Sequence, residues 1–273
     1  MLARTPSRPV GTTTRGTTHP NRLRRMDRWI AATHGAELRR AGTPVAVDLG
    51  YGAAPWTAVE LLHRLRRVAP GTRVVGVEID PARVAAAQPY ARAGLAFRHG
   101  GFEIPLPDEG PVLIRAANVL RQYHESEVAA AWARLCARLA PADPGRGVRG
   151  GLLVEGTCDE IGRRHVWVAL GPEGPRTVTF ATHLATLLRP SELAERLPKV
   201  LIHRNVPGEP VHTFLRDFDR AWASAAPFAA YGARQRWIAA VRALAGHWPV
   251  TDGPERWRQG EVTVAWPALA PLG

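Results

Sequence analysis

The chain has 273 residues, enough for one large domain, and 45% of them are hydrophobic, which is normal for a globular protein with a sizeable core. No stretch approaches the roughly 18–20 apolar residues that span a bilayer, and the N-terminus lacks the apolar run of a secretory signal. Two cysteines, Cys136 and Cys158, are too few for a disulfide framework or a zinc cluster. We therefore expect a cytoplasmic protein with no metal site and no membrane attachment.

The net charge of +12 suggests an anionic partner, but the kind and the distribution of the basic residues weaken this argument. All but one of the 36 basic residues are arginine, as a general arginine bias would produce. Residues 1–40 hold nine arginines against two acids, so the basic signal belongs to the N-terminal arm. Two interpretations of this arm stay open: a solvated or docking segment, or one that binds a polyanion such as nucleic acid.

Residues 1–20 are rich in Thr, Arg, Pro and Gly, a composition typical of a flexible arm. From residue 21 the pattern changes. Leu23, Met26 and Ile30 recur at three- and four-residue spacing, which predicts an amphipathic helix that Gly42 can end.

Strands and helices then alternate. Apolar runs predict five strands at 45–50, 73–79, 95–100, 111–119 and 151–157. Helices are predicted after Pro55, after Asp80 and at 125–139. Strands separated by helices need crossover connections, which favour a parallel sheet with helices on both faces. Residues 164–170 and 176–184, joined by a Gly/Pro loop, predict an antiparallel hairpin at the end of this α/β fold.

Beyond the hairpin the pattern is less regular. It predicts a short helix at 191–197, a loop at 203–215, helix at 216–246 with a break near Pro227, and a strand at 261–267. Five of the nine tryptophans lie between 222 and 266, and core packing is their expected role. The expected organisation is an arm at 1–20, a main domain at 21–200 that includes the N-terminal helix, and a helical, tryptophan-rich extension at 201–273 packed on that domain.

The stretch "VAVDLGYGAAP", residues 45–55, is the first candidate site. Its strand is followed by Gly50 and Gly52, which let a ligand approach the backbone where a helix begins. The next strand ends in Glu78, and a carboxylate there can accept both hydroxyls of a ribose. Two answers stay open: a nucleotide-like cofactor, or a tight strand-to-helix connection without a ligand.

This stretch and "VVGVEIDPARV" after it resemble motifs I and II of the class I S-adenosylmethionine (SAM) methyltransferases. The matching residues are Asp48, Leu49, Gly50, Gly52 and Glu78. The resemblance covers residues 43–182 and implies a Rossmann-like domain with SAM as its cofactor. A nicotinamide dinucleotide enzyme is the nearest competitor, but Pro55 stands where its fingerprint has a third glycine. A non-catalytic Rossmann-like fold is the remaining possibility.

The resemblance also implies which residues hold SAM. The candidates are Asp48, Gly50, Tyr51, Gly52, Glu78, Ile79, Gly101, Phe102 and Asn118. Family members often carry an acid after the third strand for the adenine amino group, and that acid is absent here. Phe102 could instead flank the adenine ring, or it could be an ordinary core residue.

A helix before the first strand commonly covers the mouth of this fold. The SAM carboxylate needs a cation or amide donors, so the candidates on that helix are Asn21, Arg22 and Arg25. A solvated basic face is an equally open interpretation of these residues.

Two further segments face the acceptor side, because strand carboxyl ends line the ligand crevice of open α/β sheets. They follow the fourth and fifth strands, and their expected substrate residues are Arg121, Tyr123, Thr157 and Asp159. A general base is needed only if the acceptor must lose a proton, and the candidates are His124 and Glu155. Cys158 is expected to be a packed residue rather than a nucleophile.

The sequence therefore predicts a SAM-dependent methyltransferase with an unassigned acceptor. A small molecule is favoured over RNA, because the arginine excess has a general explanation and no N-P-P-Y type signature occurs. The alternative is a non-catalytic protein of the same fold that binds nucleic acid or a protein partner.

Overall fold

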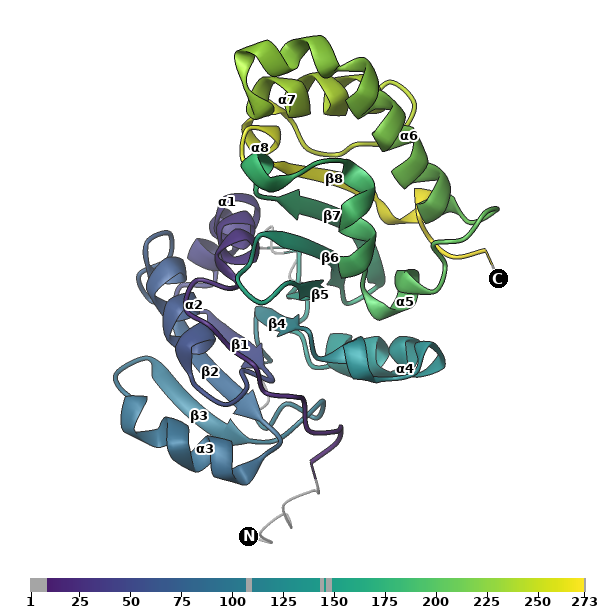
Figure 1. Cartoon of the computed structure of the whole chain (residues 1–273). Helices are drawn as coiled ribbons and strands as arrows, with labels where there is room; N and C mark the ends of the chain where they lie inside the picture. The colour runs from purple at the N-terminus through teal and green to yellow at the C-terminus, as the bar shows by residue number, and fades with distance from the viewer. Residues whose placement is uncertain (1–8, 107–109, 143–144, 146–148, 273) are drawn as a thin grey trace, which may run out of the picture.

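The computed structural model describes residues 9–106, 110–142, 145 and 149–272, and their strands form one eight-stranded sheet (Figure 1). The sheet order is β3-β2-β1-β4-β5-β6-β7-β8. The bounds are β1 (Val45–Leu49), β2 (Arg73–Glu78), β3 (Leu95–His99), β4 (Leu113–Ala117), β5 (Leu152–Cys158), β6 (Arg164–Gly171), β7 (Gly174–Thr182) and β8 (Glu261–Ala265). The first five are parallel neighbours, which confirms the predicted α/β fold.

The antiparallel part of the sheet holds the predicted hairpin and one more strand. β6 pairs with both β5 and β7, and β8 pairs with the far edge of β7. Val178 of β7 lies between Val168 of β6 and Val264 of β8. Thus a strand from the last fifteen residues completes the sheet that begins at residue 45.

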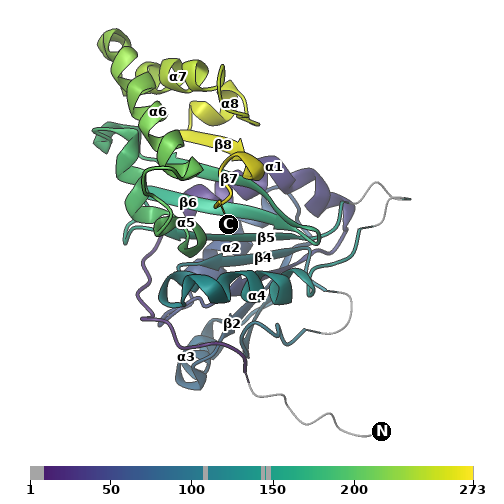
Figure 2. The same ribbon diagram turned by 90° about the vertical axis from the view of Figure 1, so that its right-hand side faces the viewer.

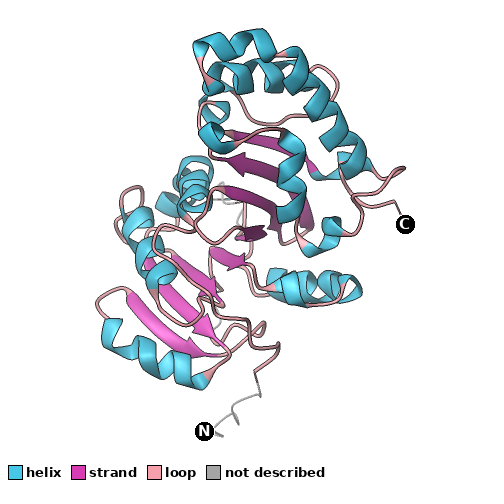
Figure 3. Ribbon diagram, viewed as in Figure 1, coloured by secondary structure: helices cyan, strands magenta, loops and turns pink. Residues whose placement is uncertain are grey.

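Helices cover both faces of the sheet (Figures 2 and 3). They are α1 (Arg24–Arg40), α2 (Trp56–Arg66), α3 (Pro81–Ala87), α4 (Glu125–Cys136), α5 (Lys199–Ile202), α6 (Pro210–Ser224), α7 (Ala233–Leu244) and α8 (Pro254–Trp257). Side chains alternate along each strand, so each face builds its own core. One core joins α1 and α2 to the sheet, and the other joins α4, α6 and α7 to it.

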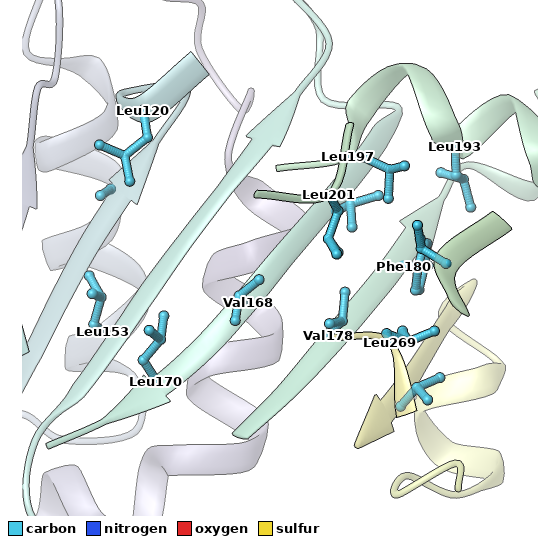
Figure 4. Close-up of a cluster of buried hydrophobic side chains, with 14 of the residues drawn as sticks. Leu120, Leu153, Val168, Leu170, Val178, Phe180, Leu193, Leu197, Leu201 and Leu269 are labelled. Atoms are coloured by element: carbon cyan, nitrogen blue, oxygen red, sulfur yellow. The ribbon is translucent and has the colours of Figure 1, made fainter. Parts of the chain in front are cut away.

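The larger core lies on the α4 face and reaches the C-terminal helices. Figure 4 shows leucines and valines of β5, β6 and β7 beside the leucines of residues 193–201. Val168, Val178 and Phe180 are fully buried in it. Burying such a side chain stabilises the fold by about 1.5–3 kcal/mol, so residues beyond 200 contribute directly to the stability of the sheet.

The loop predicted at 203–215 was wrong for its last six residues, because α6 begins at Pro210. Proline suits the first turn of a helix, where its missing N–H is not needed. The buried residues of α6 then recur at helical spacing: Val211, Phe214, Leu215, Phe218 and Trp222. The short helix predicted at 191–197 is a 3-10 helix from Pro190 to Arg196.

A buried ion cluster joins α1, α2, β1 and β4. Arg115 of β4 is fully buried and binds Asp48 of β1 through two nitrogens, at 2.8 and 3.1 Å. It also pairs with Asp27 of α1, which receives a second bond of 2.6 Å from Arg64 of α2. The Thr57 hydroxyl donates to Asp48 at 2.6 Å. Each buried charge therefore has partners from at least two elements.

Replacing Arg115 should cost much of the stability of the fold. Arg115→Met would leave Asp27 and Asp48 buried without their main counter-charge, and breaking such a pair costs about 3–5 kcal/mol. Urea unfolding should show this as a large fall in the midpoint. Arg73→Met, at an exposed position that begins β2, is the matched control, and its unfolding midpoint should stay close to that of the unaltered protein. Equal losses in both variants would contradict the assigned role of the cluster.

Candidate functional site

The glycine turn after β1 has the backbone geometry that the motif requires. Gly50 and Gly52 have φ angles of 68° and 87°, a region that favours glycine. The Gly50 N–H donates to Val77 of β2 at 2.7 Å, which ties the turn to the neighbouring strand end. The turn therefore presents bare backbone at the carboxyl edge of the sheet.

Glu78, at the end of β2, is buried beside this turn. Its carboxylate accepts hydrogen bonds from the backbone N–H groups of Gly52 and Ile79, each at 3.0 Å, and of Asp80 at 3.3 Å. Arg83 lies 3.7 Å away. These donors hold the charge in place between the ends of β1 and β2.

Residues 10–18, which we name the strap, cross the carboxyl edge of the sheet before α1 begins; they are part of the purple trace in Figure 1. The Val10 carbonyl accepts from the Phe102 N–H at 2.8 Å, and the Val10 N–H donates to Glu103 at 2.8 Å. The Thr12 N–H donates to the Tyr123 hydroxyl at 2.6 Å. The strap is thus bonded to the segments that follow β3 and β4.

The strap also contacts the glycine turn and α3. The Gly16 carbonyl accepts from the Ala53 N–H at 2.9 Å, and Arg83 donates to the Thr14 carbonyl at 3.0 Å. A Cβ on Gly52 would lie 2.8 Å from the Gly16 oxygen, so the two backbones touch.

Gly11 of the strap lies beside Ile79, Phe102 and Tyr123. A Cβ on Gly11 would be 3.0 Å from the Tyr123 hydroxyl, 3.6 Å from Ile79 Cδ1 and 3.9 Å from Phe102 Cε2. One of the two interpretations of Phe102 from the sequence places an adenine ring beside it, in this space. The N–H of Phe102, which could bond to that ring, is already used by Val10.

A pocket of about 450 Å³ lies beside the strap, at the carboxyl ends of β1, β4 and β5. Its lining includes strap residues 14–18, the glycine turn, Asn118, Cys158 and Glu160. Four arginines also line it: Arg15, Arg22, Arg121 and Arg196. The pocket is therefore mostly polar.

Asn118 shapes the pocket floor by joining β4 to β5. It has a φ of 61°, its amide donates to Cys158 Sγ at 3.1 Å, and its side-chain oxygen accepts from the Cys158 N–H at 3.0 Å. Burial raises the pKa of the Cys158 thiol. The thiol stays protonated at neutral pH, as suits a packed residue rather than a nucleophile.

The predicted site residues fall into three groups. Those that line the pocket are Asp48, Gly50, Tyr51, Gly52, Asn118, Arg22 and Arg121. Those that contact the strap, outside the pocket lining, are Ile79, Gly101, Phe102 and Tyr123, and Glu78 lies beside the glycine turn instead. Those that the structure places elsewhere are Asn21, Arg25, His124, Glu155, Thr157 and Asp159.

The residues of the third group have other contacts. Asn21 donates from its backbone to Glu60, and Arg25 donates to the Gln259 carbonyl. His124 caps α4, with its ring nitrogen facing the Ser126 N–H. The Asp159 carboxylate accepts from two backbone N–H groups of the turn that follows β5. Thr157 is buried in β5.

Glu155 faces away from the pocket, toward the α4 side of the sheet. It pairs in register with Val168 of β6, whose side chain belongs to the core on that side. Its Oε2 has no hydrogen-bond partner among the described residues. Burial raises the pKa of Glu155 to about 8.

Sequence reasoning missed the strap and Arg196 as parts of the site. The composition of residues 10–18 indicated a flexible arm, although its two glycines and three consecutive threonines also suit close backbone packing. Arg196 carried no signal, because it lies far along the chain in an irregular region. In the described part of the chain, His, Cys, Asp and Glu form no group that could hold a metal. None of the described helices has the length and apolar character of a membrane span.

No protein-family model matches the chain, and no curated protein matches its sequence. Solved structures of SAM-dependent methyltransferases do match. Human N-acetylserotonin methyltransferase in complex with SAM is 23% identical, with a TM-score of 0.31 over 49% of this chain and 37% of that one. RosA from Streptomyces davawensis, a dimethyltransferase of N,N-8-amino-8-demethyl-D-riboflavin, is 17% identical, with a TM-score of 0.34 over 48% and 37%.

The N-methyltransferase NodS from Bradyrhizobium japonicum WM9 is 15% identical, with a TM-score of 0.30 over 48% of this chain and 68% of that one. The matched part of this chain thus spans little more than a third of the first two proteins. At these identities and TM-scores the reaction of this chain has to be inferred from its own site residues.

Glu155 should make the fold less stable as the pH rises. Its pKa is about 8 when folded and 4.5 when unfolded, so between these values the unfolded chain binds fewer protons. The free energy of unfolding should fall there by up to about 1.4 kcal/mol per pH unit. Glu155→Gln removes this loss. Urea unfolding at pH 5, 6.5 and 8 should therefore show that the free energy of unfolding of the variant rises relative to that of the unaltered protein as the pH increases.

Glu160→Gln, at an exposed carboxylate near the end of the same strand, is the control and should keep the pH profile of the unaltered protein. A constant difference between Glu155→Gln and the unaltered protein across this range would show that Glu155 titrates normally in the fold.

Proposed function

We propose that this chain is a SAM-dependent methyltransferase that acts on a small-molecule acceptor. The observation that supports this most directly is the Gly50–Gly52 turn beside the buried carboxylate of Glu78, at neighbouring ends of parallel strands. Open parallel sheets bind their ligands at such strand ends. The sequence resemblance concerns the same residues.

The chain offers a partner for each part of SAM. Glu78 would accept the ribose hydroxyls, and the bare backbone of Gly50 and Gly52 would lie along the cofactor. Arg22 is buried and lines the pocket, so its guanidinium would bind the carboxylate of the methionine end. Phe102 would offer its N–H and its ring to the adenine once the strap has moved.

SAM, when bound, supplies a methyl group on a sulfonium that an acceptor can displace in line. The chain then has to align the acceptor and keep water out. Asn118 and Arg121 line the pocket at the end of β4 and would position the acceptor there. The pocket volume of about 450 Å³ suits a small molecule.

The proposed bases His124 and Glu155 do not line this pocket. Its two described carboxylates are Asp48, which is paired with Arg115, and the exposed Glu160. We therefore favour an acceptor whose nucleophilic atom needs no strong base, since nearby guanidinium groups lower the pKa of an acidic acceptor. Two further expectations from the sequence stay proposals: a location in the cytoplasm, and binding of nucleic acid by the basic N-terminal arm.

Glu78→Gln should weaken SAM binding at least about tenfold, because a hydrogen bond to a charged group contributes about 1.5–3 kcal/mol. Isothermal titration calorimetry of the full chain with SAM measures this. Asp80→Asn is the matched control: it lies two residues away, caps α3 and keeps that role as asparagine. Equal affinities of the Glu78 variant and the unaltered protein would refute the proposed ribose contact.

The absence of SAM binding in both the full chain and the strap variant introduced below would refute the methyltransferase function. The non-catalytic alternative, a protein of this fold that binds nucleic acid or a protein partner, would then take its place.

A further inference from the structure

Four guanidinium groups surround one pocket, and they come from four separate segments. Arg15 belongs to the strap, Arg22 precedes α1, Arg121 follows β4, and Arg196 ends the 3-10 helix after β7. The fold brings Arg121 and Arg196, which are far apart in sequence, next to the two arginines of the N-terminal segment. Such a gathering costs free energy through mutual repulsion unless an anion offsets it.

The hydrogen bonds that Arg22 and Arg121 make within the described residues do not compensate their charges. Arg22 donates to the backbone carbonyls of Thr17 at 2.6 Å and Asp159 at 3.0 Å. Arg121 donates to the Glu195 carbonyl at 3.4 Å. A backbone carbonyl satisfies a hydrogen bond but carries no net charge.

Arg196 has a buried donor that is left unsatisfied by the described residues. Its Nε is buried without a hydrogen-bond partner in the described part of the chain. Its nearest carboxylate in the described residues is that of Glu195, 3.9 Å away and 65% exposed, which is a weak pair in water. A buried donor of this kind is costly unless a ligand accepts from it.

The acids near the pocket offset little of this charge. Asp48 is 2.8 Å from Arg115 and is paired with it, and Asp159 does not line the pocket. Only Glu160, exposed on the rim, remains among the described lining carboxylates.

The electrostatics of Arg121 agree with this geometry. Burial and the charges of Arg196, Arg15 and Arg22 lower the pKa of Arg121. The pocket is therefore a positive site that an anion would stabilise.

We propose that Arg121 and Arg196 bind an oxyanion, a carboxylate or a phosphate, carried by the methyl acceptor. The backbone of Glu195 beside Arg196 accepts from Arg121, so these two arginines are neighbours on the acceptor side. Arg22 is left for the SAM carboxylate. The planar guanidinium fork matches both kinds of oxyanion. The assignment to an acceptor rests on the proposed function, whereas the anion site itself does not.

The test uses inorganic phosphate and benzoate as probes, one for each kind of oxyanion. Both are titrated into the full chain by calorimetry at constant ionic strength, so that general screening does not change. At least one probe should bind, and the double variant Arg121→Gln, Arg196→Gln should weaken it at least about tenfold. Arg234→Gln, at an exposed position on α7, is the control and should bind as the unaltered chain does.

Glu160→Gln provides a change of the opposite sign at an exposed residue. Removing the rim carboxylate should make the same probe bind more tightly, because it removes a negative charge that repels the bound anion. Binding of neither probe, or equal binding in the double variant, would overturn the anion site. SAM titrations of the same samples separate this result from the proposed function: anion binding without SAM binding refutes the methyltransferase and keeps the anion site.

A second inference concerns the strap and rests on the proposed function. We infer that strap residues 10–16 occupy the adenosine side of the site and compete with SAM there. The Val10 carbonyl accepts from the Phe102 N–H, Gly11 lies beside Ile79 and Phe102, and Gly16 lies against Gly52. A cofactor of the proposed kind needs the same donor and the same space, so the two occupants exclude each other.

Gly11→Val should displace the strap in the full-length chain. Gly11 has a φ of 133°, which other residues rarely adopt, and its Cβ would meet the Tyr123 hydroxyl at 3.0 Å. SAM and free adenosine should then bind several-fold more tightly. Gly208→Val is the matched control, since Gly208 has a φ of 98° and open space around it.

Trypsin gives a second measurement that needs no variant. Arg15 is exposed at the surface of the strap, and SAM should speed cleavage after it by releasing the segment. Equal SAM affinity in Gly11→Val and the unaltered chain, or slower cleavage with SAM, would overturn the competition. Both outcomes require SAM to bind, so they differ from a failure of the proposed function.

Discussion

The buried contact of Arg115 with Asp27 and Asp48 is the constraint on which the site depends. Asp48 lies two residues before Gly50, and Asp27 lies in the first turn of α1, the first helix after the strap. One guanidinium therefore fixes both the glycine turn and the helix that the strap leads into. Its charge has to be compensated where it is buried, so the two carboxylates cannot move apart without a large cost.

Two halves of the site follow from this arrangement. On the side of β2 and β3, the strap uses backbone donors and packing space that a nucleoside would need. On the side of β4 and β5, a polar pocket with four arginines stays open. The open half carries four arginines, and in the closed half the strap is held mainly through its backbone groups. The two proposed ligands therefore bind under different conditions. An anionic acceptor can enter a pocket that is already open, whereas SAM has to displace a segment of the chain.

The arginine-rich pocket also bears on the chemistry of a methyl acceptor. None of the predicted bases faces the pocket, and the Cys158 thiol is protonated because it is buried. Guanidinium groups next to an acidic acceptor favour its deprotonated form without themselves accepting a proton. Positive charge can thus replace a general base when the acceptor is acidic enough.

Much of the fold was predictable because its signals are local. The apolar runs at β1 to β7 lie within single strands, and Asp80 caps α3 through the adjacent N–H groups. The start of α6 was missed because Pro210 was taken with the preceding loop, although the apolar spacing continues to it. The motif residues from Asp48 to Glu78 were found for the same reason: turn, strand end and helix start are neighbours in sequence.

The sequence by itself determined the alternating α/β pattern, the glycine turn and the acid at the end of β2, because each depends on residues within a few positions. Only the tertiary structure decided what meets at the site. Val10 bonds to Glu103, 93 residues away, Arg115 to Asp27, 88 away, and Arg22 to Asp159, 137 away. Such pairs leave no periodicity or spacing in a single sequence. They exist because the parallel order of the sheet brings the ends of β1 to β5 to one edge, where the N-terminal segment crosses them.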